Sequence, residues 1–278
     1  MNLLDAIAAA GMTPPRQIVP GKWMRFPGIG KGKSNKAGWC RLIEPTLAIF
    51  GDWSTGLSEI WRDDSHRDDE TSARLLREAR IRERSFIAVQ RAKQREAAHK
   101  AQDLIDAAMQ MPHPYLQKKG LGHVLGLVFG EHLLVPVRDV YDYSLISLQQ
   151  INPDGEKRFL QGSRARGGIY RIGSQGKTFL CEGYATGFSI HEAAKRLYKH
   201  SAVIVCFSAG NLETVAPKFP DACVCADHDA TGVGEAAARR TGLPWIMPAE
   251  IGDFNDVHCR SGLHAVVTAI RGEPTLPA

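Results

Sequence analysis

The sequence lacks any apolar run close to the ~20 residues that a membrane-spanning helix needs. Its first eleven residues are mildly apolar, but they contain Asp5 and no basic leader. This pattern predicts a short amphipathic helix and not a secretion signal. We therefore expect a cytoplasmic protein without a membrane partner.

The sequence also lacks a Cys-x-x-Cys pair and a His-Glu-x-x-His motif, although it has six cysteines and ten histidines. A structural zinc site needs about four ligands, and Cys40 is the only cysteine in the first hundred residues. No zinc is therefore expected. Buried free thiols in a reducing compartment are the expected state of the four cysteines in predicted strands, which are Cys181, Cys206, Cys223 and Cys225.

Two nucleotide- or calcium-binding loops are absent as well. The segments 32–34 and 176–178 both end like a P-loop, but Pro27 and Arg171 stand where that motif needs its first glycine. The chain thus shows no helicase motor, and a replicative helicase would be a separate partner. Asp227 begins a segment like an EF-hand loop, but Ala238 occupies the position of the required bidentate glutamate.

Carboxylates are missing from residues 157–177, in a chain of 278 residues with a formal charge of +5 and a pI of about 8.9. The same segment contains six cations: Lys157, Arg158, Arg164, Arg166, Arg171 and Lys177. Such an imbalance suits the phosphates of a nucleotide or a nucleic acid. A solvated surface loop is the simpler alternative.

Two acidic clusters follow this segment, each at the end of a short apolar run. Residues 178–181 lead into Glu182, and residues 222–226 lead into Asp227 and Asp229. A helix-like stretch follows each cluster, and this order is typical of an α/β sheet with carboxylates at the carboxyl ends of its strands. Three carboxylates gathered there would repel one another unless a cation such as Mg²⁺ or Mn²⁺ lay among them. Without metal, we expect at least one of their pKa values to be raised.

Residues 176–272 read as one α/β unit followed by a tail at 273–278. We predict four strands, at 178–181, 202–207, 222–226 and 244–247, and four helices, at 186–199, 212–218, 233–241 and 264–271. This alternation favours a mostly parallel sheet with helices on both faces.

Three smaller units precede it. Residues 112–175 predict a small mixed subdomain with a hairpin formed by 133–139 and 145–151. Residues 63–111 are strongly basic and nearly free of Gly and Pro, which predicts one helix or a helix pair as a connector. Residues 1–62 predict a β-rich unit with strands at 23–26, 37–42 and 47–53.

The N-terminal unit combines tryptophans with lysines. Base stacking on aromatic rings beside cations is how proteins bind single strands without sequence preference. We therefore expect template binding by a set of five residues: Lys31, Lys33, Lys36, Trp39 and Trp53. The alternative is that the tryptophans form the core of a small β unit.

The ordered set of Glu182, Asp227 and Asp229 resembles the Toprim domain of DnaG-type primases, topoisomerases and related nucleases. The sequence motifs at residues 113–116, 182–187 and 253–256 are similar to those of primases of plasmids, phages and mobile elements. The resemblance implies a catalytic role for Glu182, Asp227 and Asp229, as general base or metal ligands. It also implies an acidic contribution to metal or nucleotide binding from Asp253 and Asp256, for which helix capping is the alternative.

The resemblance implies a DNA primase that joins ribonucleoside triphosphates on single-stranded DNA, with Lys157, Arg158, Arg164, Arg166 and Lys177 on the nucleotide or template. Two other functions stay open. One is a Toprim nuclease that uses the same carboxylates, and the other is a non-catalytic DNA-binding replication accessory.

Overall fold

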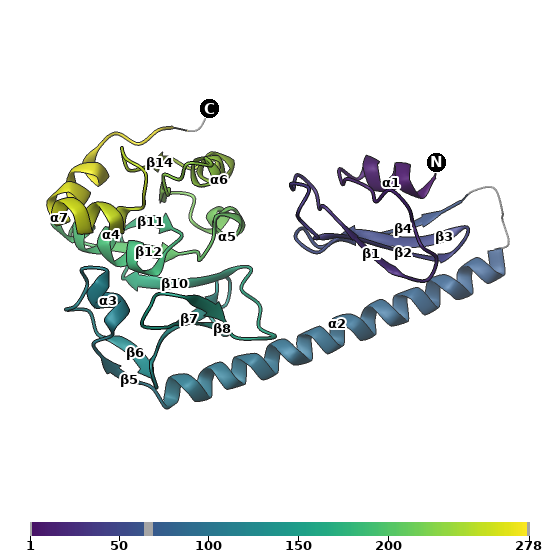
Figure 1. Cartoon of the computed structure of the whole chain (residues 1–278), viewed down its shortest axis with the longest axis horizontal. Coiled ribbons are helices and arrows are strands. Elements are labelled where there is room, and N and C mark those ends of the chain that lie inside the picture. Colours follow the sequence, from purple (N-terminus) through teal and green to yellow (C-terminus); the bar gives the residue numbers. More distant parts are fainter. Residues whose placement is uncertain (1, 64–68, 277–278) are drawn as a thin grey trace. The chain divides into compact units, whose positions relative to one another are not determined.

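The computed structural model describes residues 2–63 and 69–276, which divide into an N-terminal unit (residues 1–84) and a C-terminal unit (residues 85–278) (Figure 1). Residues 64–68 of the expected connector and residues 277–278 of the expected tail lie outside the described residues. Each unit has its own sheet and its own apolar core.

The N-terminal unit consists of a helix and, within residues 2–63, a four-stranded antiparallel sheet. The helix is α1 (Leu3–Ala9), and the strands are β1 (Trp23–Phe26), β2 (Gly38–Glu44), β3 (Leu47–Asp52) and β4 (Leu57–Arg62). The helix and the first three strands agree with the predicted ones. The sequence did not predict β4, because this edge strand is mostly polar or exposed and buries only Trp61.

The helix α1 packs on one face of this sheet. Asn2 caps it by accepting a hydrogen bond from the Asp5 amide at 2.8 Å. Leu3, Ala6 and Ile7 then form an apolar core with strand residues that include Phe50. The opposite face of the sheet has no part in this core.

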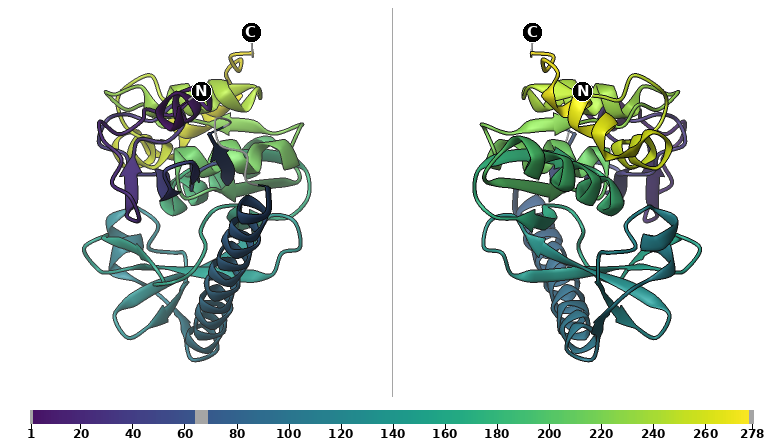
Figure 2. Two further views of the ribbon diagram at one scale, coloured as in Figure 1. Left: turned by 90° about the vertical axis from the view of Figure 1, so that its right-hand side faces the viewer. Right: turned by 90° about the vertical axis from the view of Figure 1, so that its left-hand side faces the viewer.

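The connector is one long helix, α2 (Asp69–Asp106), of 38 residues (Figure 2). Glycine and proline are absent from this stretch, so nothing in the sequence breaks the helical backbone. Its last turns belong to the C-terminal unit, where Ala97 and Ala101 pack on Leu134 and Leu148. Among the described residues, no helix is both long and apolar enough to cross a membrane.

Within residues 85–276, the C-terminal unit contains a ten-stranded mixed sheet. Its strands are β5 (Met109–Met111), β6 (Gly126–Phe129), β7 (His132–Asp139), β8 (Leu145–Ile151), β9 (Lys157–Phe159), β10 (Gly168–Gly173), β11 (Lys177–Cys181), β12 (Ser201–Val205), β13 (Cys223–Cys225) and β14 (Trp245–Ile246). The order is β14-β13-β11-β12-β10-β7-β6-β5, and β8 and β9 extend from β7. Because β10 pairs with both β7 and β12, the segments 112–175 and 176–272 share one sheet.

The strands β11 to β14 are parallel, which confirms the predicted α/β fold with a mostly parallel sheet in this region. Helices cover both faces (Figure 1). One face carries α4 (Tyr184–Leu197) and α7 (Phe254–Arg271). The other carries α5 (Ala209–Val215), which continues into the 3-10 turn η1 (Ala216–Lys218), and α6 (Val233–Thr241).

Of the four predicted helices, α6 has its predicted bounds, α4 and α5 begin two and three residues earlier than predicted, and α7 differs most. The helix α7 begins ten residues before residue 264, because a capping box formed by Asp253 and Asp256 starts it and Gly262, with φ of 77°, only interrupts it. A short helix, α3 (Pro114–Lys118), was not predicted, and His113 caps it. Five cysteines are buried and Cys259 is exposed, all with free thiols.

Asp52 is the polar residue on which the N-terminal unit depends most. Its buried carboxylate accepts hydrogen bonds from the Ile29 amide at 2.7 Å and from the amide and hydroxyl of Ser54. Replacing it in Asp52→Ala removes the acceptor of three donors, so we expect a loss of about 1–3 kcal/mol of stability. Denaturant unfolding followed by tryptophan fluorescence measures this loss, since four of the five tryptophans lie in this unit. The exposed Glu44→Ala is the matched control, and equal stability of the two variants would contradict the assignment.

Candidate active site

The strand order of the parallel region brings two acidic loops together. Along the chain, β12 follows β11 on one side, and β13 then returns to the other side of β11. The loops after β11 and β13 therefore diverge to opposite faces and leave a crevice at the carboxyl edge, which is where open α/β sheets bind ligands. Glu182 follows β11, and Asp227 follows β13 after one residue.

Among the carboxylates of the described residues, Asp227 has the most strongly raised pKa. Its Oδ1 is buried and has no hydrogen-bond partner among the described residues. Burial, followed by repulsion from Glu182 and Asp253, raises the pKa of Asp227 to about 7, and Lys157 counteracts part of this shift. A buried anionic oxygen without a donor is a position that a cation would stabilise.

Glu182 lies on the neighbouring loop in a partly buried position. Burial is the main cause that raises its pKa, with a smaller contribution from repulsion by Asp229, while a hydrogen bond from the Ala209 amide acts in the opposite direction. Ala209 is the first residue of α5, so the carboxylate lies against the start of this helix.

The turn between β12 and α5 shapes this wall of the site. Phe207 adopts a φ of 68°, which is rare for a bulky side chain and costs on the order of 1–3 kcal/mol. Its amide donates to the Glu182 carbonyl at 2.9 Å. The buried amide of Asn211 holds the turn, because it donates to the carbonyls of Cys206 at 2.7 Å and Gly168 at 2.8 Å and accepts from the Gly167 amide. Sequence reasoning missed Asn211, and no local pattern marks it.

Asp229 has a different role from its neighbour. Its two carboxylate oxygens accept from the hydroxyl of Thr231 and from the amides of Thr231, Val233 and Gly234 at the start of α6. The Thr231 hydroxyl and then the Gly234 amide lower its pKa. Gly234 is required for this close approach, since a Cβ there would lie 2.2 Å from the Asp227 carbonyl oxygen. The structure thus turns Asp229 towards a helix terminus.

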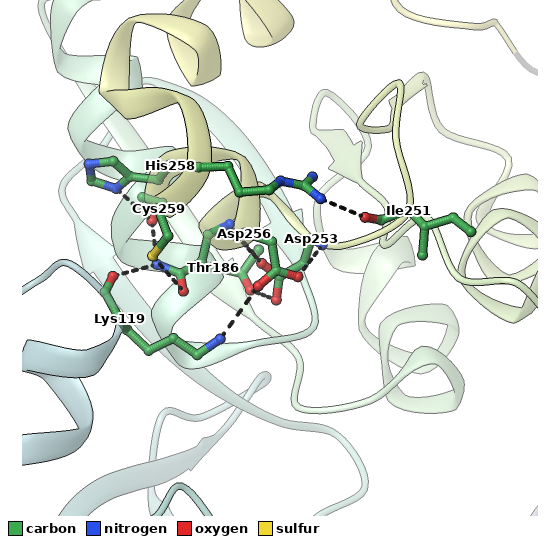
Figure 3. Close-up of polar contacts among 10 residues, drawn as sticks. Lys119, Thr186, Ile251, Asp253, Asp256, His258 and Cys259 are labelled. Atoms are coloured by element: carbon green, nitrogen blue, oxygen red, sulfur yellow. Dashed lines mark hydrogen bonds and ion pairs between the residues drawn. The ribbon is translucent and has the colours of Figure 1, made fainter.

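Asp253 and Asp256 also cap a helix (Figure 3). Asp253 Oδ1 accepts from the amides of Asn255 and Asp256, and its Oδ2 accepts from the Thr186 hydroxyl at 2.9 Å. Asp256 accepts from the Asp253 amide and lies 3.7 Å from the Lys119 Nζ. The alternative of helix capping is therefore observed for both residues, and a part in metal or nucleotide binding stays a prediction.

A buried amide fixes Lys119 beside this cap. The Asn255 Nδ2 donates to the Lys119 carbonyl at 2.9 Å and to the Ser189 hydroxyl at 3.0 Å. The backbone that ends α3 is thereby tied to the start of α7. Lys119 is a cation at the acidic edge that the sequence analysis did not single out.

Lys157 also lies at this edge. Lys157 is an exposed residue, and partial desolvation of its ammonium group together with repulsion from Lys119 lowers its pKa, while Asp253 and Asp227 act in the opposite direction. The ammonium lies 5.8 Å from the centroid of the Tyr115 ring. Phe159, two residues further along β9 and thus on the same face, contacts Phe207.

The other cations expected on nucleotide or template differ in their positions and contacts. Arg158 points to the other side of β9 from Lys157 and lies 3.5 Å from Glu156. Arg164 pairs with Asp139 and donates to the carbonyl of the exposed Arg166. Lys177 starts β11, so it lies at the amino edge of the sheet, about 16 Å of strand away from Glu182.

The five expected residues of the N-terminal unit differ in exposure. Lys31, Lys33 and Lys36 are exposed, Trp39 is only 6% exposed and Trp53 is 45% exposed. Trp39 therefore cannot present its whole ring to a base.

The donors at the acidic edge suit a hard divalent cation. Within residues 2–63 and 69–276, no three His, Cys, Asp or Glu side chains form a ready metal cluster. Mg²⁺ needs no such cluster, because it is commonly held by one or two carboxylates, waters and substrate phosphates. Asp227, with its unpartnered oxygen, and Glu182 fit that kind of site.

Comparison with known proteins agrees with this placement. Residues 177–264 match the Toprim domain family, so this part of the chain is a Toprim domain, which implies divalent metal binding. Two Escherichia coli proteins named DNA primase TraC are each 28% identical to the chain, one over 70% of this chain and 15% of that protein, the other over 73% and 20%. The chain thus spans at most a fifth of the length of these relatives.

Solved primase structures show a weaker likeness. The primase fragment of the bacteriophage T7 primase-helicase protein is 15% identical with a TM-score of 0.40, over 56% of this chain and 69% of that one. A DNA primase domain from Pseudomonas aeruginosa is 13% identical with a TM-score of 0.37, over 61% and 57% of the two chains.

The raised pKa of Asp227 predicts a specific pH dependence of stability in metal-free buffer. Between the unfolded value of ~3.9 and about 7, the folded chain holds a proton that the unfolded chain has released. The contribution of this group is therefore fully present below about pH 4 and is lost as the pH rises through 7. We expect Asp227→Asn to raise stability by about 1–3 kcal/mol at pH 8 and to leave it nearly unchanged at pH 4.

Thermal or denaturant unfolding at the two pH values measures this difference. Asp221→Asn is the matched control, because it makes the same chemical change at the exposed amino end of β13. An equal effect of Asp227→Asn at both pH values would show that Asp227 has an ordinary pKa.

Proposed function

We propose that the chain is the catalytic core of a DNA primase, which joins ribonucleoside triphosphates on single-stranded DNA in a metal-dependent reaction. The observation that carries the proposal is the buried, unpartnered Asp227 oxygen beside Glu182, with Lys157 and Lys119 at the same edge. The similarity to two DNA primases supports the choice of reaction. A separate replicative helicase is the proposed partner that supplies the single strand.

The proposed reaction joins a 3′ hydroxyl to the α-phosphate of an incoming nucleotide. The P–O bond to the β-phosphate breaks, pyrophosphate leaves with the bonding electrons, and the hydroxyl proton passes to a base. A divalent cation, when bound, lowers the pKa of the hydroxyl and neutralises charge on the phosphates. Nucleotidyl transfer at such a site depends mainly on positioning and charge.

In this proposal, some acidic residues bind the cation and others position neighbouring elements. Asp227 and Glu182 supply the carboxylate oxygens at the crevice, and their mutual repulsion makes the binding of positive charge favourable there. Asp229 and Asp253 fix the helix starts that flank Asp227. Asp256 positions Lys119.

The cations have the complementary task of holding the triphosphate. The Lys157 ammonium interacts electrostatically with Asp227, and this supports a contact between Lys157 and the phosphates. Phe159, on the same face of β9, contacts Phe207 with 5.7 Å between ring centroids. Template contacts by Arg158, Arg164, Arg166 and Lys177 remain part of the proposal.

Incorporation of labelled ribonucleotides on single-stranded DNA with no primer supplied tests the function directly. We expect synthesis that requires Mg²⁺ or Mn²⁺ and falls at least about 100-fold in Asp227→Asn, because the variant lacks a charged ligand. Asp221→Asn should retain normal activity. If the purified chain degrades the DNA and incorporates no nucleotide, the nuclease alternative holds, and if it does neither, the non-catalytic alternative holds.

Substitutions at two lysines distinguish a specific phosphate contact from a non-specific effect of positive charge. Lys157→Ala should raise the KM for nucleotides about tenfold with a smaller effect on kcat, since it removes a charged contact to the ground-state triphosphate. Lys199→Ala is the matched control, because this exposed lysine lies just before the amino end of β12, and we expect less than a twofold change. Steady-state kinetics over a nucleotide series measures both. Equal effects of the two substitutions would refute a specific role for Lys157.

A further inference from the structure

The sheet of the N-terminal unit has two faces of different chemistry. Side chains along a strand alternate between the faces, and the antiparallel register fixes which residues share one. The α1 side carries Phe26, Cys40, Phe50 and Trp61. The opposite face, which we term the open face, carries at its strand positions Trp23, Arg25, Trp39, Arg41, Glu44, Leu47, Ile49, Gly51, Ser58, Ile60 and Arg62.

Three tryptophan rings form a row along the open face. The Trp39 ring lies between the other two, with centroids 5.3 Å from Trp23 and 5.3 Å from Trp53. Gly51 makes room for it, since a Cβ at this position would lie 2.7 Å from the Trp39 ring. Trp39 is only 6% exposed, whereas Trp23 and Trp53 are 50% and 45% exposed. The buried ring therefore supports two outer rings that present π surface to solvent.

The charges of the open face are mostly positive. Arg41 lies over the Trp23 ring, 5.8 Å from its centroid, and Arg25 is paired across the strands with Trp39. The strand positions of the open face include three arginines and one carboxylate, Glu44, which lies at the end of β2 beyond Arg41. Of the nearby acids, Glu59 is opposite Phe50 and thus on the α1 side, and Asp52 is buried in hydrogen bonds to the adjoining loop.

A lysine-bearing loop is fixed at the Trp53 end of this row. The Arg25 guanidinium donates to the Lys36 carbonyl, with Nε at 2.7 Å, and the Trp53 amide donates to the Ala37 carbonyl at 3.0 Å. The Ile29 amide is bound by Asp52 at the end of β3. These contacts hold the loop of residues 27–37, with its exposed lysines, beside the tryptophan row: Lys31, Lys33 and Lys36.

We propose that the open face binds single-stranded DNA, with bases stacked on Trp23 and Trp53 and phosphates held by Arg25, Arg41 and the loop lysines. Stacking accepts any base, and exposed aromatics on a four-stranded sheet are an established way to hold unpaired nucleotides. The choice of DNA over RNA rests on the proposed primase function. The row of rings is long enough for about two to three nucleotides.

Two features favour a nucleic acid over an apolar protein partner. The outer rings are separated by a buried ring and flanked by guanidinium groups, so the surface is not a continuous apolar patch. Three arginines against one carboxylate give the face a net positive charge, which complements phosphate. The sequence analysis chose Trp39 and Trp53 for stacking, and the structure replaces Trp39 by Trp23 as the second exposed ring.

Binding of a labelled twelve-nucleotide oligo-dT to the full chain, without metal or nucleotide, tests the inference. We expect the double change Trp23→Leu with Trp53→Leu, which keeps apolar bulk but removes π surface, to weaken binding at least about tenfold. Trp23→Phe with Trp53→Phe should weaken it less than about threefold. Arg16→Ala, an exposed cation of the same unit outside the sheet, is the control and should have no effect.

The loop lysines provide a second test that does not touch the sheet. Changing Lys31, Lys33 and Lys36 to Ala should reduce the slope of log affinity against log salt by about 2, since each phosphate contact on a single strand contributes about 0.7. Unaltered affinity of the double Leu variant, an unaltered salt slope, or equally tight binding of a duplex of the same length would each overturn the inference. A chain that makes primers but shows such a result keeps its proposed function, and a chain that binds DNA but makes no primer loses only that function.

Discussion

Burial of Asp227 beside other carboxylates is the interaction on which the arrangement of the C-terminal unit depends. The order of the parallel strands makes it unavoidable, because β11 and β13 are neighbours and their carboxyl ends carry Glu182 and Asp227. The cost appears as a pKa near 7 and as an oxygen without a hydrogen-bond partner among the described residues. Repulsion between these carboxylates destabilises the edge when no cation is present, and a bound cation relieves it. A site for metal-bound phosphates needs this property.

The remaining acids of the edge stabilise helix starts. Asp229 accepts two hydrogen bonds from Thr231, just before α6, and two from Val233 and Gly234 in its first turn, and Asp253 forms a capping box with Asp256 at α7. Helix starts attract negative charge, so these carboxylates stabilise the fold whether or not they also bind a cation. A count of carboxylates alone would therefore overstate how many are ready to bind a cation. Asp253 and Asp229 still add to the negative potential that raises the pKa of Asp227.

The parallel sheet and its acidic edge could be predicted from the sequence, because few other folds accommodate apolar runs that end in carboxylates and lead into helices. The bounds predicted for α6 agree with the structure. The edge or face of the sheet on which a side chain lies was harder to predict. Lys177 is the last cation of the basic segment, yet it begins β11 and so lies at the opposite edge of the sheet from Glu182. Trp23 and Trp39 are alike in sequence, and only the packing of three rings decides that Trp39 is buried. Asn211 holds its turn partly through the Gly168 carbonyl, 43 residues earlier, a contact that no local pattern encodes.

The central claim is that the unpartnered Asp227 oxygen is where a divalent cation binds. Anomalous diffraction at the manganese edge, from crystals grown with Mn²⁺ and a ribonucleoside triphosphate, locates the ion directly. The account predicts a peak about 2.0–2.3 Å from Asp227 Oδ1 that also contacts phosphate oxygens of the nucleotide. A peak bound elsewhere on the chain, with Asp227 still unliganded, would contradict it.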